Sequence, residues 1–175
     1  KGWTRRIIST QGGVVCEPYY NKVLDFAMEF YVAHGSIECV GYSLFETDSR
    51  GIYKGNCLAS NEEIERRLSV YINPEILGWT RNALMQELLK LADGIYQGYL
   101  GVDMMVVHNA DGYALHPCVE VNWRMNMGVV SRLFFDRYMS PASSGSYVIE
   151  FYPNKGEALN FHEEMKRKYP LRLQE

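Results

Sequence analysis

Two acidic side chains, an amide and a guanidinium occur close together in the second half of the chain: Asp103, Glu120, Asn122 and Arg124. Carboxylate and amide oxygens are the ligands that Mg²⁺ prefers, and an arginine fork matches the oxygens of a phosphate. Like charges that face each other on a sheet repel, and a divalent cation held between them would turn that repulsion into attraction. These residue types predict a magnesium and phosphate site, provided that the fold brings them together.

One β-hairpin is expected to do so. Residues 101–108 and 113–122 have the composition of strands, and the dipeptide Asp111-Gly112 between them favours a two-residue type I′ turn. Pairing across that turn places Asp103 directly opposite Glu120. Because strand side chains alternate between faces, the amide and the guanidinium are expected on the same side.

A polar face turned toward water is the plain alternative, because many antiparallel sheets expose acidic residues to solvent. The pairing also depends on Pro117, which lies in the second strand. Proline removes a backbone donor and favours a sheet edge or a bulge. A bulge between residues 113 and 120 would shift the pairing by one residue.

The composition is that of an ordinary globular domain. Its 175 residues are enough for one domain with a core, so residues 1–175 are treated as a single domain. The net charge of −3 argues against nucleic acid as a partner. No apolar run approaches the ~20 residues needed to cross a bilayer, so a membrane is not an expected partner either.

The four cysteines are widely spaced along the chain: Cys16, Cys39, Cys57 and Cys118. They show no Cys-x-x-Cys spacing, and each lies in an apolar, strand-like context. This favours reduced, buried thiols in a cytoplasmic protein over disulfides. The four histidines form no metal-ligand spacing.

Strands, turns and helices are expected on both sides of this hairpin. Further strands are predicted at residues 5–10, 13–17, 22–31, 36–46, 52–58 and 147–152, with His34-Gly35 as a hairpin turn. Helices are predicted from about Asn61 to Pro74, and at 75–96, 128–139 and 155–169. The fold class is therefore α+β, an antiparallel β-sheet with helices packed on one side.

The predicted strand at 22–31 alternates clearly between apolar and polar side chains. Its apolar face carries Leu24, Phe26, Met28 and Phe30, and its other face carries Asp25 and Glu29. Arg81 and Arg132 are assigned to solvated helix faces.

Three stretches follow one another in a recognisable order. Residues 14–20 precede the strand 25–30, the long helix leads into Gly98-Tyr-Leu-Gly-Val-Asp103, and the second strand of the hairpin ends in Glu120-Val-Asn-Trp-Arg124. Together they resemble the C-terminal half of an ATP-grasp enzyme, whose metal-binding motif is Glu-x-Asn-x-Arg. The resemblance covers about residues 13–139. The family's upstream half, with its lysine-bearing strand and glycine-rich loop, is expected to lie outside this chain.

The resemblance implies a role for each polar residue of the hairpin. Asp103 would be the first metal-binding acid, and Glu120 would bridge two Mg²⁺ ions on the triphosphate of ATP. Asn122 would be the third metal ligand. Arg124 would contact the transferred phosphate or the acyl-phosphate formed from it.

Two further groups receive roles in the same way. Glu17 and the backbone of Cys16, Pro18 and Tyr19 would hold the adenine and ribose of ATP. Arg50 and Lys54 would line the site of the acceptor, although exposed basic residues on a loop are the simpler interpretation of these two.

The implied activity is that of part of an ATP- and Mg²⁺-dependent ligase. It would join a small-molecule carboxylate to an amine-type acceptor through an acyl-phosphate, and the chain alone is expected to bind ATP weakly. The sequence is compatible with a monomer and with a homo-oligomer. The alternatives are a non-catalytic nucleotide-binding or regulatory module of the same fold, a metal-dependent nuclease or phosphatase, and an interaction domain with a coincidental acidic face.

Overall fold

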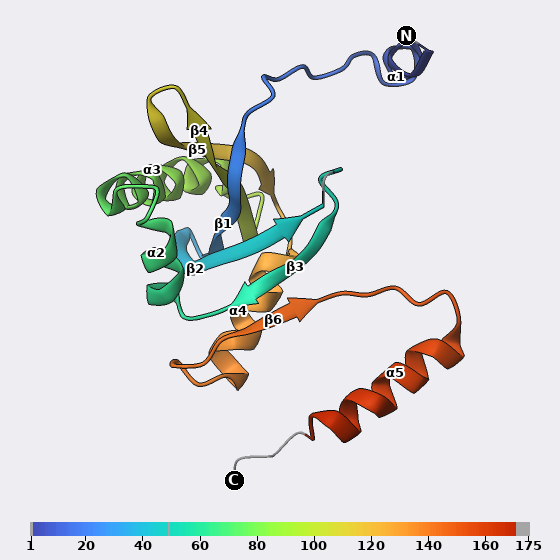
Figure 1. Cartoon of the computed structure of the whole chain (residues 1–175). Coiled ribbons are helices and arrows are strands. Elements are labelled where there is room, and N and C mark those ends of the chain that lie inside the picture. The colour runs from blue at the N-terminus through green and yellow to red at the C-terminus, as the bar shows by residue number, and fades with distance from the viewer. Residues whose placement is uncertain (1, 49, 171–175) are drawn as a thin grey trace.

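The structure is a computed structural model that describes residues 2–48 and 50–170 (Figure 1). It is an α+β protein built on one antiparallel sheet of six strands. The strands are β1 (Lys22–Ala33), β2 (Ser36–Thr47), β3 (Tyr53–Leu58), β4 (Gly98–Asn109), β5 (Gly112–Asn122) and β6 (Gly145–Val148). They lie in the order β5-β4-β1-β2-β3-β6. The helices are α1 (Gly2–Gln11), α2 (Asn61–Leu68), α3 (Pro74–Ala92), α4 (Met127–Tyr138) and α5 (Lys155–Lys168).

The hairpin turn predicted at His34-Gly35 and the predicted start of α2 near Asn61 are confirmed. The turn between β1 and β2 has a positive φ at both His34 (50°) and Gly35 (73°), as a type I′ turn requires. Ser60 caps α2, because its side chain accepts a hydrogen bond from the backbone nitrogen of Glu63 at 3.2 Å.

The strands predicted before residue 22 are wrong. Residues 2–11 form α1, and residues 12–21 have no regular structure. The segment pairs with neither edge strand of the sheet, β5 or β6. A helix satisfies most of its backbone groups internally, so residues 2–11 need no partner strand.

Several boundaries also differ from the prediction, and α2 ends at Leu68 rather than near Pro74. Helix α3 ends at Ala92 rather than Tyr96, and Gly94 follows with a φ of 70°, the left-handed conformation that ends helices. Strand β6 ends at Val148 rather than Tyr152, because its pairing with β3 stops there.

The apolar face of the sheet forms the main core. Helices α2 and α3 cover it, as Figure 1 shows. The buried side chains come from both central strands and both helices and include Phe26, Met28, Phe30, Leu100, Val102, Met104, Ile64, Leu68, Leu77 and Leu88. The alternation predicted for β1 is therefore confirmed, and burial of this face supplies most of the driving force for folding.

Helix α4 lies against the opposite face, so the prediction that helices pack on one side holds for α2 and α3 and is wrong for α4. Glu29 alternates with Met28 and Phe30 on β1, and its carboxyl group lies against Gly128 at the start of α4. A helix on this side covers acidic side chains that would otherwise face water. The sequence pattern of β1 predicted its apolar face but could not show that a helix would also cover the other face.

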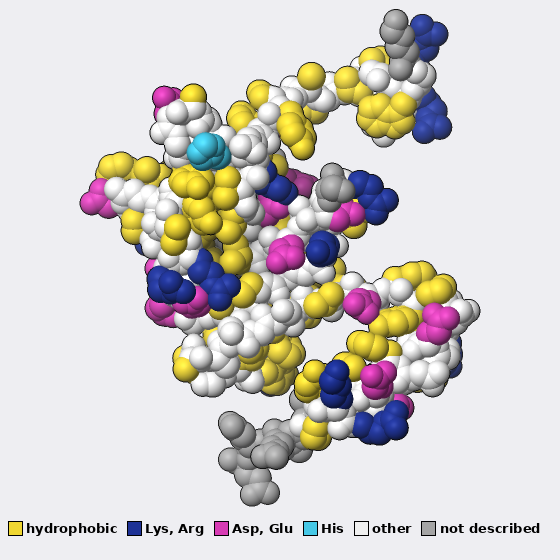
Figure 2. Space-filling view, viewed as in Figure 1, with side chains coloured by type: hydrophobic (Ala, Val, Ile, Leu, Met, Phe, Trp, Pro, Cys, Tyr) yellow, Lys and Arg dark blue, Asp and Glu magenta, His cyan; other side chains and the backbone are white. Residues whose placement is uncertain are grey.

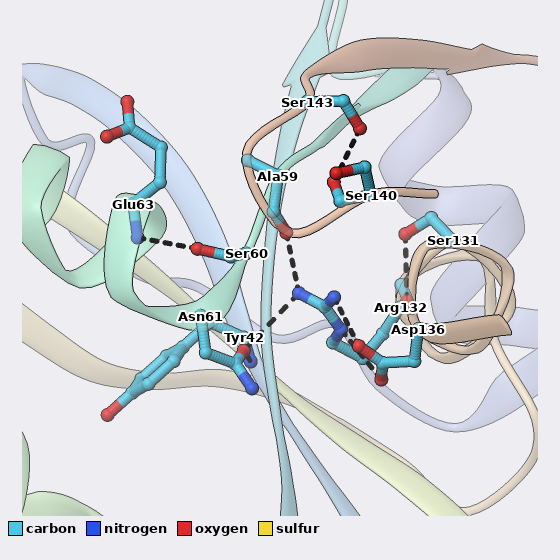
Figure 3. Close-up of polar contacts among 11 residues, drawn as sticks. Tyr42, Ala59, Ser60, Asn61, Glu63, Ser131, Arg132, Asp136, Ser140 and Ser143 are labelled. Carbon is cyan, nitrogen blue, oxygen red and sulfur yellow. Dashed lines mark hydrogen bonds and ion pairs between the residues drawn. The ribbon is translucent and has the colours of Figure 1, made fainter. Parts of the chain in front are cut away.

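The buried guanidinium of Arg132 anchors α4 to the start of α2 (Figure 3). Its Nη1 donates to the carbonyl oxygen of Ala59 at 2.7 Å and, at 3.4 Å, to Oδ1 of Asn61. Its Nη2 donates to Asp136 at 2.6 Å. The expectation that Arg132 lies on a solvated helix face is wrong, because this side chain is only 3% exposed.

The two terminal helices bury no residue. Figure 1 shows α1 and α5 apart from the sheet, each joined to it by an extended segment. Each helix of the described chain is too short or too polar to cross a membrane.

All four cysteines are free thiols, as predicted. Their predicted burial is wrong for Cys16 and Cys118, which are exposed. Cys16 lies in the irregular segment before β1, and Cys118 lies on an edge strand.

Candidate functional site

The hairpin of β4 and β5 places the two acids opposite each other as predicted, but its turn and its register differ from the prediction. Asp103 is paired with Glu120, which confirms the central expectation. The turn lies one residue earlier than predicted, because Asn109 pairs with Gly112, whose φ is 110°. Left uncorrected, this shift would have separated the two acids.

A bulge on β5 restores the pairing. Met105 pairs with His116, and Asp103 pairs with Glu120. Between these two pairs, one residue of β4 lies opposite three residues of β5, 117–119. The bulge contains Pro117, which has no backbone donor for the ladder. It adds two residues rather than the single one expected, and an even insertion keeps side chains on their original faces.

The four predicted hairpin residues line one cavity of about 390 Å³, on the sheet face opposite the main core: Asp103, Glu120, Asn122 and Arg124. Contacts join three of them in a row. Nδ2 of Asn122 donates to Oδ2 of Asp103 at 3.2 Å, and Nη2 of Arg124 donates to Oδ1 of Asn122 at 3.0 Å. The spatial convergence predicted from the sequence is therefore confirmed.

The acid pair at the centre is short of positive charge. The pKa of Asp103 is raised to about 6, mainly by burial and next by the neighbouring charge of Glu120, while Asn122 and Arg124 act in the opposite direction. A carboxyl group in this situation gains from any cation that enters the cavity.

Several residues that sequence reasoning did not assign also line the cavity. Lys22 forms an ion pair with Asp25 and donates from Nζ to Oγ1 of Thr47 at 2.7 Å. Glu29 is fully buried and accepts hydrogen bonds from Ser43 and Asn126.

The alternation of β1 had already placed Asp25 and Glu29 on the face opposite the core. Their relation to the hairpin comes from the pairing of β1 with β4, in which Ala27 lies opposite Asp103. These two strands are about seventy residues apart in the chain, and no local pattern predicts that pairing.

The structure does not bring the predicted adenine-binding residues to the cavity. Cys16, Glu17, Pro18 and Tyr19 lie in the irregular segment before β1, and all four are exposed. None of them lines the cavity.

The two predicted acceptor-site residues also lie outside it. Arg50 forms an ion pair with Asp48 at 3.1 Å, and Nζ of Lys54 lies 3.7 Å from Glu46; both basic side chains are mostly exposed. Tyr53 lines the cavity while the adjacent Lys54 does not, and the register of β3 on β2 shifts at this point, where Glu46 pairs with Gly55 and Thr47 with Tyr53.

The oxygen donors of the hairpin suit a metal ion that takes its remaining ligands from water or substrate. Among residues 2–48 and 50–170, no three His, Cys, Asp or Glu side chains gather closely enough to hold a metal. The hairpin offers two carboxylates and one amide. Mg²⁺ is commonly bound by one or two carboxylates together with water and substrate phosphates, so these residues fit it.

Neither a comparison with known protein families nor one with curated proteins finds a match for this chain.

Proposed function

We propose that this chain supplies the metal- and phosphate-binding part of an ATP- and Mg²⁺-dependent carboxylate ligase of the ATP-grasp type. The observation that carries the proposal is the meeting of Asp103, Glu120, Asn122 and Arg124 in one cavity. These residues also occur in the order, and on the elements, that the resemblance implies.

The charges in the cavity support a metal–phosphate ligand. Four carboxyl groups line it, those of Asp25, Glu29, Asp103 and Glu120, and they face only two cationic side chains, those of Lys22 and Arg124. A bare triphosphate would be repelled by this surface. A triphosphate that carries Mg²⁺ can be held, because the metal can be shared between phosphate oxygens and these carboxylates and so bridges the two.

The proposed reaction has two steps. A carboxylate oxygen of the substrate attacks the γ-phosphorus of ATP, and ADP leaves with the bonding electrons. The amine-type acceptor then attacks the acyl carbon, and inorganic phosphate leaves as the amine loses a proton. Positioning and charge neutralisation supply most of the catalysis in such transfers.

Each hairpin residue has a task in this reaction. Asp103, Glu120 and Asn122 hold and orient the metal-bound phosphates. The guanidinium of Arg124 steadies the transferred phosphate. Contact of adenine with Cys16, Glu17, Pro18 and Tyr19 requires their segment to approach the cavity. Arg50 and Lys54 are worse placed for the acceptor than Lys22.

Metal binding can be tested on the chain itself. Mn²⁺, a spectroscopic substitute for Mg²⁺, is titrated in the presence of ADP and followed by electron paramagnetic resonance. Glu120→Gln and Asn122→Ala should each weaken binding by about tenfold or more. Glu46→Gln is the matched control, because this acid is exposed and lies outside the cavity. Unchanged affinity in both cavity variants would remove the basis of the proposal.

A non-catalytic nucleotide-binding module of the same fold is the second candidate. It is favoured by the outward ion pairs of Arg50 and Lys54, which leave Lys22 as the main cation for an acceptor. The natural full-length protein decides between the two. ADP release that depends on an added carboxylate and amine supports a ligase, whereas metal-dependent nucleotide binding without turnover supports the module. Phosphate release without a carboxylate would indicate a phosphatase.

A further inference from the structure

Glu29 has no task in the proposed metal chemistry, although it lines the same cavity. Its side chain is fully buried, and both of its oxygens already have donors. Oε1 accepts from the hydroxyl of Ser43 at 2.7 Å, and Oε2 accepts from the amide of Asn126 at 3.2 Å. A carboxyl group occupied in this way is poorly placed to bind a metal. Because burying such a group is costly, its presence calls for another explanation.

The contact with Asn126 shows what Glu29 can do. Oδ1 of Asn126 accepts from the backbone nitrogen of Val129 at 2.9 Å and so caps α4, while its Nδ2 donates to Glu29. One amide therefore joins the start of a helix to the central strand β1. The short loop 123–126, which contains Arg124, runs from the end of β5 to this cap.

We propose that Glu29 is a positioning residue which, through Asn126, fixes the loop 123–126 and with it the place of the Arg124 guanidinium in the cavity. The use of Arg124 in phosphate binding rests on the proposed function, whereas the fixing of the loop does not.

Two glycines leave the room that this arrangement needs. A Cβ at Gly128 would overlap Oε1 of Glu29 and the hydroxyl of Ser43. A Cβ at Gly101 would overlap Nδ2 of Asn126 and Oε2 of Glu29. Both neighbouring elements, α4 and β4, therefore carry no side chain where the carboxyl group lies.

The two hydrogen bonds do not require a charge. The pKa of Glu29 is raised to about 7, mainly by burial and also by the charge of Asp103, while the hydrogen bonds from Ser43 and Asn126 act in the opposite direction. The hydroxyl of Ser43 can accept as well as donate. A glutamine at position 29 could therefore donate to Ser43 and accept from Asn126, with the same shape and no charge.

Four substitutions separate positioning from general stability. Glu29→Gln keeps both hydrogen bonds, and Glu29→Met removes both at similar volume. Asn126→Ser keeps a residue that caps helices well but is too short to reach Glu29. Ser131→Ala is the control, since it removes a different buried hydrogen bond, to the carbonyl oxygen of Gly128 at 2.8 Å, from the same helix.

The first measurement is hydrogen exchange of the backbone amides of residues 124–126, together with ¹⁵N relaxation of the Arg124 Nε–H group. Glu29→Met and Asn126→Ser should each raise loop exchange by about tenfold or more and increase the motion of the guanidinium. Glu29→Gln and Ser131→Ala should stay within about twofold of the wild type. Asn126→Ser keeps the test decisive if Glu29→Met does not fold.

Either of two results would overturn the proposal: a loop that stays protected in Asn126→Ser and in folded Glu29→Met, or a loop that loosens equally in Ser131→Ala. The second measurement is phosphate release by the natural full-length protein. A positioning role predicts a lower kcat with an unchanged KM for ATP in Asn126→Ser, and full activity in Glu29→Gln. Absence of turnover in the wild type would count against the ligase and leave the exchange experiment to decide the role of Glu29.

Discussion

Asp103 is held in a state that is unfavourable for the metal-free protein. Its carboxyl group is partly buried, faces Glu120, and has a pKa raised to about 6. Such a group lowers stability at neutral pH, because folding removes it from water while it is charged. Sites that bind ligands commonly carry this kind of cost.

Asp103→Asn should therefore stabilise the chain while it removes metal binding. We expect the free energy of unfolding of the metal-free variant to rise by about 1 kcal/mol at pH 7.5, because the neutral amide is not repelled by Glu120. Mn²⁺ affinity should fall by at least about tenfold. Denaturant unfolding and Mn²⁺ titration measure the two effects. A destabilised variant with intact metal affinity would contradict both.

Glu29 provides a prediction about pH. Its pKa is raised from 4.5 to about 7 in the folded protein, so its contribution to stability is complete below pH 4.5 and is lost as the pH rises through 7. The full difference corresponds to about 3 kcal/mol. Glutamine does not titrate, so the stability of Glu29→Gln relative to the wild type should increase between pH 5 and pH 8.

Urea unfolding of both proteins at pH 5, 6, 7 and 8 measures this difference directly. The ionisation of Asp103 is present in both proteins and largely cancels. A difference in unfolding free energy that stays constant across this range would show that Glu29 does not titrate there.

At the scale of elements, the start of α4 is built around β1. Gly128 is buried and lies against the carboxyl group of Glu29 and the hydroxyl of Ser43. The buried guanidinium of Arg132 then ties the next turn of the helix to the carbonyl oxygen of Ala59, as Figure 3 shows. Helix α4 is therefore placed by polar contacts together with the burial of Val129 and Phe135.

Gly128→Ala should lower the free energy of unfolding by about 2 kcal/mol or more, because the added methyl group has no space. In a Glu29→Ala background the added cost should fall by at least about 1 kcal/mol, since the clash is relieved. A double-mutant cycle in denaturant measures this coupling. Gly156→Ala, in α5 with nothing near its Cβ position, is the control. Equal costs of Gly128→Ala in both backgrounds would contradict the close approach.

At the scale of the whole molecule, the two terminal helices lie outside the part that contains the buried core. The sheet with α2, α3 and α4 contains the buried side chains, whereas α1 and α5 bury none. Figure 2 shows hydrophobic side chains exposed on both terminal segments, the one with α1 and the one with α5. Among those of the segment with α5 are Phe151, Leu159 and Phe161.

Removal of everything after Pro153 should therefore change the free energy of unfolding by less than about 1 kcal/mol, because none of the removed residues up to 170 is buried. Calorimetry and denaturant unfolding of the shortened chain check this. A loss above about 2 kcal/mol would mean that α5 packs against the sheet in solution.

Local physical chemistry made much of this molecule predictable from its sequence. Period-two alternation identified β1 and its apolar face, the dipeptide His34-Gly35 identified a hairpin turn, and the start of α2 was predicted near Asn61. Each of these signals acts within a few residues. The pairing of Asp103 with Glu120 was also predicted, although two deviations, in the turn and in the bulge, cancelled to produce it.

Only the tertiary structure decided what surrounds that pair. The pairing of β1 with β4 brings Asp25 and Glu29 to the cavity, and the packing of α4 buries Glu29 against Gly128. Contacts between distant segments depend on the whole set of competing pairings, which no local pattern encodes. For the same reason the exposure of Cys16 and Tyr19 could not be predicted, because it depends on which strands occupy the edges of the sheet.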